Sequence, residues 1–164
     1  MAESNAIFRV HCALISALCV VDIVLNSTVE YGNIISHQET SSNTNTIITI
    51  VQVLLQIFAL INFFALLGAT FLFRSGLFSL LYSQFRFIIL AHPLYILQTV
   101  VLGGVRVKHL SSGVALSEIW DSSFYIFFSF LQKMGAIYAY VCSIHAIEKL
   151  RNPKFYDQEY WLRR

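Results

Sequence analysis

Four long apolar runs occupy most of this chain and decide in which solvent it folds. A helix needs about 20 mostly apolar residues to cross the hydrocarbon core of a bilayer, and each run is close to that length or longer. The second run carries no charged residue. We therefore predict an all-α membrane protein, a single domain over residues 1–164, with four transmembrane helices in a compact bundle. The expected spans are residues 7–26, 47–73, 87–105 and 122–147.

The composition argues against several classes of function. The chain is 57% hydrophobic and 12% charged, whereas soluble domains are about 25% charged. The net charge is only +2, and no basic patch with interleaved aromatic residues indicates a nucleic-acid partner. No hydrolase, metalloprotease or P-loop motif occurs. We expect a protein that is not an enzyme, that has no cofactor, metal site or small-molecule substrate, and that is surrounded by membrane lipids.

The basic residues predict how the chain is oriented in the membrane. Cytoplasmic loops carry an excess of Lys and Arg, and four spans place both termini on the same side. Arg106 and Lys108 would lie on the opposite side. The side with the termini would hold most of the basic residues: Arg9, Arg74, Arg86, Lys149, Arg151, Lys154, Arg163 and Arg164. We therefore predict that both termini are cytoplasmic and that residues 148–164 form a cytoplasmic tail.

Three further signals divide the chain. Leucines at helical spacing within Arg74–Arg86 predict a short cytoplasmic interfacial segment between the second and third spans. His92-Pro93 predicts a kink in the third span, because proline removes a backbone donor and clashes with the preceding turn. Asn152-Pro153 predicts the end of the fourth helix, because the residue before a proline avoids the α region.

Small and polar side chains share one face of three expected spans. Small residues let helix backbones approach, and amide side chains hydrogen-bond between helices. The fourth span carries such residues at every fourth position. We expect helix packing through Ser16, Gln52, Gln56, Gly135, Ala139 and Ser143.

Two charged residues, Asp22 and Lys133, fall inside the expected spans. A charge at the bilayer centre costs about 2.5–3.5 kcal/mol on insertion scales, so each needs a partner or an exit. Three alternatives remain open at this point: the two residues pair with each other, they reach an interface, or they face a partner protein. Asn26 begins a formal N-glycosylation sequon, which we expect to be unused because it lies too near the membrane.

The most specific motif lies in the tail, where Asn152–Arg163 reads NPKFYDQEYWLR. A second motif, FLFRSGLFSLLYSQF, spans Phe71–Phe85. With the pair Gln132-Lys133, these segments resemble the transmembrane protein 138 family, four-pass proteins of ciliated eukaryotes. The second and third spans are similar to that family only in hydrophobic character.

The resemblance implies a non-enzymatic multi-pass membrane protein that is needed for cilium assembly. It would act in membrane-protein trafficking or scaffolding at the ciliary base or transition zone, with other multi-pass ciliary membrane proteins as partners. Its location would be the cilium or ciliary base, and also vesicle or vacuolar membranes. The expected tail residues for docking or anchoring are Phe155, Tyr156, Trp161 and Arg163.

Two alternatives follow from the residues alone. A small accessory subunit of a large membrane complex, such as a respiratory assembly, has the same hydrophobic character. A small transporter or pore subunit would use Asp22, Lys133 and the kink, and it would need a continuous polar path.

Overall fold

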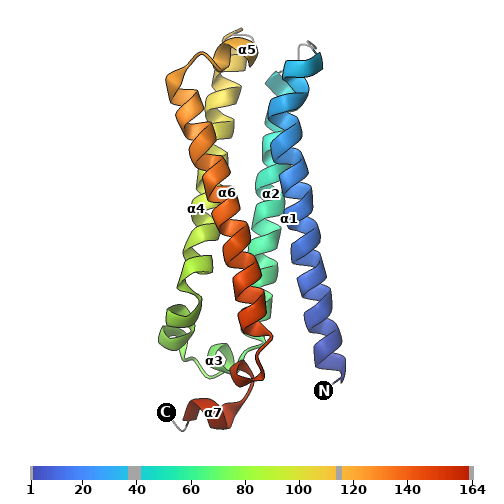
Figure 1. Ribbon diagram of the computed structural model, residues 1–164, viewed down its shortest axis with the longest axis vertical. Coiled ribbons are helices and arrows are strands. Elements are labelled where there is room, and N and C mark those ends of the chain that lie inside the picture. Colours follow the sequence, from blue (N-terminus) through green and yellow to red (C-terminus); the bar gives the residue numbers. More distant parts are fainter. Residues whose placement is uncertain (1, 37–41, 114–115, 163–164) are drawn as a thin grey trace.

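The computed structural model describes residues 2–36, 42–113 and 116–162 of the chain. Within these ranges every regular element is helical, which confirms the predicted all-α class. Four long helices and three short ones follow one another, and a 3₁₀ turn at Pro153–Phe155 precedes the last (Figure 1). The long helices are α1 (Ala2–Ser36), α2 (Ser42–Gly68), α4 (Phe78–Ser111) and α6 (Ser123–Leu150), and the short ones are α3 (Phe71–Arg74), α5 (Leu116–Ile119) and α7 (Gln158–Leu162).

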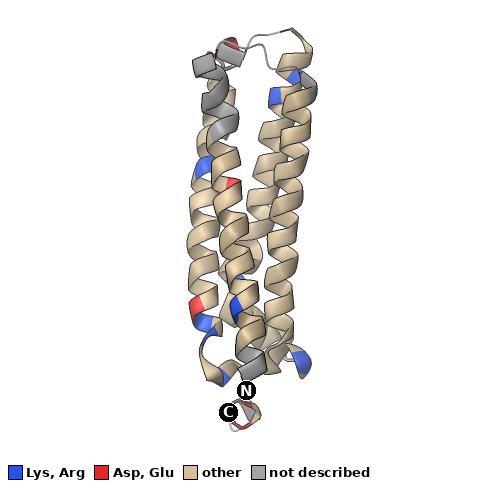
Figure 2. Ribbon diagram, turned by 90° about the vertical axis from the view of Figure 1, so that its right-hand side faces the viewer, with Lys and Arg blue, Asp and Glu red and all other residues tan. Residues whose placement is uncertain are grey.

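The four long helices run side by side along the long axis of the molecule, and both chain ends lie at the same end of the bundle (Figure 1). Helix α1 packs on α2, α2 packs on α4, and α4 packs on α6. Most Lys and Arg positions lie toward the two ends of the bundle, and the shaft between them carries few charged positions among the described residues (Figure 2). The shaft therefore has the charge pattern of a membrane-crossing bundle.

Three helices are long and apolar enough to cross a membrane: Ala6–Ser27, Thr44–Gly68 and Phe78–Ser111. Helix α6 has 28 residues, and at a rise of about 1.5 Å per residue it is long enough to cross as well. The polar pair Gln132-Lys133 interrupts its middle. The chain is thus an all-α membrane protein, and the fourth span remains a prediction.

Helices α1 and α2 end at residues that the sequence did not predict. Helix α1 continues past residue 26 to Ser36. A helix makes its backbone hydrogen bonds internally whether its side chains are polar or apolar, so the polar residues after the apolar run do not end it. Helix α2 ends at Gly68, before the expected residue 73. The Thr70 hydroxyl donates to the Leu67 carbonyl at 2.6 Å and accepts from the Phe73 amide at 3.4 Å, so it caps the new helix α3.

The break in α4 lies at Phe85 and not at the expected His92-Pro93. Phe85 has φ −123° and ψ 16°, and it is the position in α4 where the backbone leaves helical geometry. The segment before it is the expected interfacial piece, and it joins the third span directly. The Lys149 ammonium donates to the Gln84 carbonyl at 2.7 Å. A basic side chain of α6 therefore hydrogen-bonds the backbone carbonyl that precedes the break.

An apolar cluster closes the bundle at the end where the termini lie. We call it the basal core, and its buried residues include Phe63, Leu66, Leu67, Leu72, Leu81, Phe85, Leu150, Phe155 and Trp161. The rings of Phe85 and Phe155 have centroids 5.3 Å apart, and those of Phe155 and Trp161 are 5.8 Å apart. The tail after α6 is therefore folded against the base of the helices.

Candidate functional site: polar clusters inside the bundle

Asp22 of α1 is the centre of a polar cluster in the middle of the bundle. Its side chain is 4% exposed. The Tyr95 hydroxyl donates to Asp22 Oδ2 at 2.7 Å and the Tyr140 hydroxyl at 2.5 Å, while Gln56 Nε2 donates to Oδ1 at 3.2 Å. These donors come from α4, α6 and α2, so one carboxylate connects α1 to the other three long helices. We call Asp22, Gln56, Tyr95, Thr99 and Tyr140 the Asp22 cluster.

His92 of α4 adds a second polar link beside this cluster. Its Nε2 atom lies 3.0 Å from the Ser143 hydroxyl of α6. Ser143 is 2% exposed, and its own hydroxyl donates to the Ala139 carbonyl at 2.8 Å. The expected packing residue Ser143 therefore joins α6 to α4 through a histidine.

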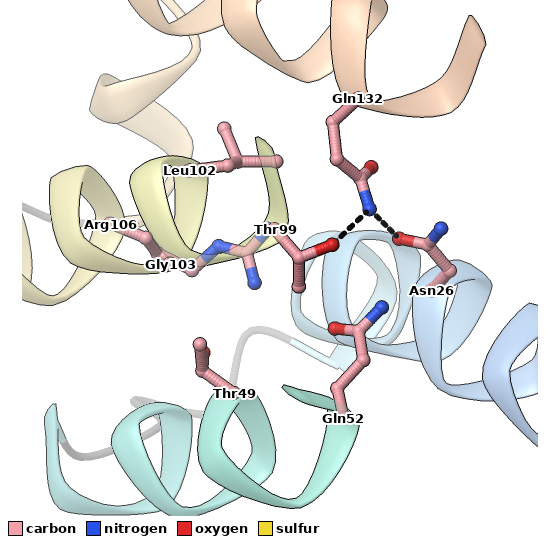
Figure 3. A pocket seen from close by; sticks show the side chains of 8 residues that line it. All are labelled: Asn26, Thr49, Gln52, Thr99, Leu102, Gly103, Arg106 and Gln132. Carbon is pink, nitrogen blue, oxygen red and sulfur yellow. Dashed lines mark hydrogen bonds between the residues drawn. The ribbon is translucent and has the colours of Figure 1, made fainter. Parts of the chain in front are cut away.

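A second cluster lies further from the termini, around the pocket drawn in Figure 3. Gln132 Nε2 donates to Asn26 Oδ1 at 3.1 Å and to Thr99 Oγ1 at 3.4 Å (Figure 3). Gln52 of α2 and Arg106 of α4 also line the pocket, next to Thr49. We call Asn26, Gln52, Thr99, Arg106 and Gln132 the outer cluster. The space that remains is about 10 Å³, roughly the room of one water molecule.

Arg106 corrects an expectation about the second outer loop. It lies inside α4, is 5% exposed and donates from Nε to the Tyr125 hydroxyl at 3.1 Å. Lys108 also belongs to α4, which ends at Ser111. Because α4 continues past residue 105, a charge that the sequence placed outside the membrane faces the interior of the bundle.

Asp22 and Lys133 do not form an ion pair with each other in the described part of the chain. The Lys133 ammonium lies 3.4 Å from Asn26 Oδ1 and 3.5 Å from Gln132 Oε1. Asn26 follows Asp22 by one helical turn, so the two charges lie at different levels of the bundle. Asn26 also donates to the Tyr95 hydroxyl at 3.2 Å. Its side chain is therefore engaged inside the bundle, unlike that of a glycosylated loop residue.

The expected small-residue face of α6 lies against α4. Ala139 is completely buried, and a Cβ atom added at Gly135 would overlap the amide oxygen of Gln98. A second close approach joins α4 to α2, where a Cβ atom at Gly103 would overlap the Thr49 side chain. Gln52 and Gln56, the expected packing residues of α2, are buried as well.

Ser16 is a correction, because the structure places it on the outer face of α1. Its side chain is exposed, and its hydroxyl donates to the Cys12 carbonyl of its own helix at 3.0 Å. The face of α1 that meets the bundle instead carries Ile15, Cys19 and Asp22. Ser16 therefore lies off the contact face of α1, one residue from the buried Ile15.

The tail residues divide into two groups. Phe155 is completely buried and Trp161 is 6% exposed, with the indole Nε1 donating to the Lys154 carbonyl at 2.6 Å. They close the basal core, so both side chains pack within the chain, whereas docking or anchoring was expected of them. Tyr156 remains exposed, although partial burial and, to a smaller extent, the Cys12 thiol raise the pKa of its hydroxyl. Arg163 lies outside the described residues.

Sequence reasoning missed the polar residues of α4. His92, Tyr95, Thr99 and Arg106 recur at three, four and seven positions, and all four are buried. That helical spacing was a detectable signal for a polar stripe facing the bundle. A further missed contact joins the amide of Asn62 to His11, through the histidine ring and through the His11 carbonyl at 2.9 Å.

The arrangement binds helices together, and it has few of the features of a catalytic site. Within the described residues, no group of three or more His, Cys, Asp or Glu side chains could hold a metal ion. The donors and acceptors of the two clusters are used mainly on one another. The chemistry that the interior shows is helix-to-helix hydrogen bonding.

Comparison with known proteins assigns the chain to a family. The family model described as Transmembrane protein 138 matches residues 45–164, which include α2, α4, α6 and the tail. The mouse protein named Transmembrane protein 138 is 27% identical over 118 residues, a stretch that covers 72% of each chain. No solved structure matches. The family match begins after α1, so it covers every long helix except the one that carries Asp22. The chain belongs to the transmembrane protein 138 family.

Proposed function

We propose that this protein is a non-enzymatic, four-pass membrane protein that acts in cilium assembly, by trafficking or scaffolding membrane proteins at the ciliary base or transition zone. The observation that carries this proposal is the family match over three long helices and the tail. The resemblance of the tail and of Phe71–Phe85 to ciliary proteins supplies the location. Vesicle membranes on the way to the cilium are a second expected location.

The proposed orientation places both termini in the cytoplasm. Four passes return the chain to its starting side, and the two ends of the chain lie together (Figure 1). Arg9, Arg74, Arg86, Arg151 and Lys154 belong to segments at that end, which agrees with the excess of Lys and Arg expected on the cytoplasmic side. The proposed orientation rests on this charge distribution.

The exterior of the shaft supports contact with lipids and with other membrane helices. Large apolar side chains cover every long helix, among them Phe58, Leu97, Phe127, Phe130 and Ile144. Because the polar groups face inward, the surface that remains for partners is apolar along the shaft and basic or aromatic at the base. Multi-pass membrane proteins are the partners that this surface fits best.

The interior offers little support for a transporter or pore. The cavities beside the Asp22 cluster and the outer cluster each have about 10 Å³, close to the size of a single water molecule. A transport path needs a connected series of polar sites across the membrane. An accessory subunit of another membrane complex would have the same apolar exterior. The location of the protein in the cell distinguishes that alternative from the ciliary proposal.

The test is localisation of a tagged full-length copy in a ciliated cell, combined with proximity labelling. We expect the tag at the ciliary base, with multi-pass ciliary proteins labelled. The variant Tyr156→Ala tests docking: its ring is 40% exposed, and the Tyr160 ring that contacts Trp161 is kept. Localisation confined to mitochondria would contradict the proposal and favour the accessory-subunit alternative.

A further inference from the structure

Two lysines lie over adjacent aromatic rings at the base of the bundle. The Lys149 ammonium of α6 is 5.4 Å from the ring centroid of Phe85, and the Lys154 ammonium of the tail is 5.2 Å from that of Phe155. The two ring centroids are 5.3 Å apart. Both lysines are half-buried, and the cation–π attraction of the rings favours this placement of their charges. We call Lys149 and Lys154 the basal lysine pair.

Hydrogen bonds fix both members of the pair. The Lys154 backbone amide donates to Asn152 Oδ1 at 3.1 Å, and its carbonyl accepts from the Trp161 indole at 2.6 Å. The Lys149 ammonium itself donates to the Gln84 carbonyl at 2.7 Å. The two charges are therefore held in place before any ligand arrives, which reduces the entropy that binding costs.

The pair has no counter-charge within the described part of the chain. Neither lysine forms an ion pair with a described residue, and an ammonium has three donors, so hydrogens remain for a ligand. The Asp157 carboxylate in the tail accepts instead from the backbone amide of Glu159 at 2.9 Å, and Glu148 is exposed on α6. Lys149 lies beyond the expected span that ends at residue 147. Partial burial, and then the nearby Lys154 ammonium, lower its pKa. Two positive charges thus repel each other where an anion would relieve them.

The surface of α4 beside the pair is suited to an acyl chain. Arg86 follows the carbonyl contact of Lys149 by two residues, and its guanidinium carbon is 4.8 Å from the ring centroid of Phe87. From this ring, large apolar side chains continue at helical spacing away from the base, and each is more than half exposed: Phe87, Leu90, Leu94 and Leu97. Positive charge therefore lies at the basal end of an apolar stripe that faces away from the bundle interior.

We propose that the base binds an anionic phospholipid whose headgroup ends in a phosphate monoester. Lys149 and Lys154 donate to the phosphate, Arg86 adds positive charge at the edge, and an acyl chain lies along the α4 stripe. A phosphate monoester carries a charge of about −1.5 to −2 at neutral pH, which matches two ammonium groups better than the single charge of a diester. Basic residues directly next to a membrane span attract anionic lipids. The inference goes beyond the proposed function and takes from it only that the shaft crosses a bilayer.

The experiment measures lipid binding to the purified full-length protein by native mass spectrometry. Phosphatidic acid carries the phosphate monoester, phosphatidylserine carries one net negative charge on a diester headgroup, and phosphatidylcholine is neutral overall. With identical acyl chains, phosphatidic acid should bind most tightly, followed by phosphatidylserine. In a second arm, inorganic phosphate is added to the protein in phosphatidylcholine nanodiscs. It should leave the unfolding temperature unchanged, because it lacks the acyl chain.

Four variants locate the site. Lys154→Met keeps the apolar stem and the backbone contacts, and it should weaken phosphatidic acid binding about fivefold, the effect of one lysine near an anionic surface. Adding Lys149→Met should bring the loss to about 25-fold if the two lysines act independently. Lys154→Arg retains the charge and should retain binding. Arg9→Met is the matched control: it removes one exposed charge from α1 at the same end of the bundle and should change the affinity less than twofold.

Preference for phosphatidic acid that is lost in Lys154→Met and kept in Lys154→Arg and Arg9→Met would establish the site. Equal affinity for phosphatidic acid and phosphatidylcholine would overturn the proposal. Equal losses in Lys154→Met and Arg9→Met would do the same, because the attraction would then be diffuse. An unfolding temperature that inorganic phosphate raises, and that Lys154→Met no longer raises, would make the ligand a free anion. Binding is measured on purified protein, so its failure is distinct from a failure of ciliary localisation.

Discussion

The two halves of the bundle interior are built differently. The basal core packs aromatic and aliphatic side chains, such as Phe63, Phe85 and Phe155, and the tail closes it. The Asp22 cluster further along the shaft joins four helices through a carboxylate, hydroxyls and an amide. The base lies next to water, where apolar burial is favourable. Inside a bilayer lipid tails are as apolar as leucine, so polar contacts decide which helix faces meet.

The basal core therefore contributes mainly to the stability of the fold, and the Asp22 cluster contributes mainly to the choice of which helix faces meet. Loss of volume should damage the basal core in proportion to the atoms removed, whereas the Asp22 cluster should respond to the loss of single hydrogen-bonding groups without a change of volume. Substitutions confined to one of the two regions therefore test whether the regions respond differently.

Phe155→Ala should have the largest effect. The ring is completely buried between Phe85 and Trp161, and truncation of a buried phenylalanine costs about 3–5 kcal/mol. Reversible unfolding in mixed detergent would measure the loss. Phe130→Ala is the matched control: its ring is 65% exposed on the lipid-facing side of α6, so its cost should be about 0.5 kcal/mol or less. Equal losses for both variants would show that the tail does not close the base.

Tyr140→Phe should cost about 1.5–3 kcal/mol, since it removes one hydrogen bond to a charged group and keeps the ring. Its hydroxyl lies 2.5 Å from Asp22 Oδ2. Tyr82→Phe removes a hydroxyl from an exposed ring of α4 and should be neutral. A double-mutant cycle with Asp22→Asn should give a coupling energy between positions 22 and 140. Additive effects of the two substitutions would refute the direct bond.

Gly103→Ala tests whether the polar half also depends on close packing. The added methyl group would overlap the Thr49 side chain, whereas the neighbouring Gly104 has open space around it. Overpacking costs about 1–3 kcal/mol, and one methyl group belongs at the low end. Gly104→Ala should be neutral or slightly stabilising, because alanine is the better helix former. If the two variants had equal stability, α2 and α4 would not approach as described.

Lys149→Met should have the smallest effect, about 1 kcal/mol, because the charged donor is only partly buried and water screens its hydrogen bond. It removes the donor to the Gln84 carbonyl beside the α4 break and preserves most of the side-chain volume. The loss should appear as faster hydrogen exchange in residues 78–86. Arg151→Met, at an exposed position two residues later, is the control. Unchanged exchange in Lys149→Met would mean that the break is stable without its polar contact.

The sequence predicted the helical class and the approximate position of each long helix, because apolar runs of membrane length have few other solutions. It also placed Ala139, Ser143, Gln52 and Gln56 among the packing residues, and the structure buries all four. These residues were identified because they are small or polar within apolar runs. Their burial agrees with the expected packing role. The variants Tyr140→Phe and Gly103→Ala test helix contacts that lie beside these residues.

The remaining features depended on contacts between distant segments. Sequence spacing cannot show that Phe155 packs against Phe85 of α4 and that Trp161 joins the same core, so the tail resembled a free docking motif. A helix break at Phe85 carries no proline signal, whereas Pro93 fits within a continuous helix. Ser16 was misplaced because the serine and the contact residue Ile15 are adjacent on α1, and a shift of one residue turns the helix by about 100°.

The most direct test of the two-region account is hydrogen–deuterium exchange on Trp161→Ala and Tyr140→Phe in the same nanodiscs. We predict that Trp161→Ala accelerates exchange around Leu67–Phe85 and leaves the middle of α1 protected. Tyr140→Phe should accelerate exchange near Asp22 and leave the base protected. If both variants accelerated exchange uniformly along the bundle, the basal core and the Asp22 cluster would be one cooperative unit, and the account would be wrong.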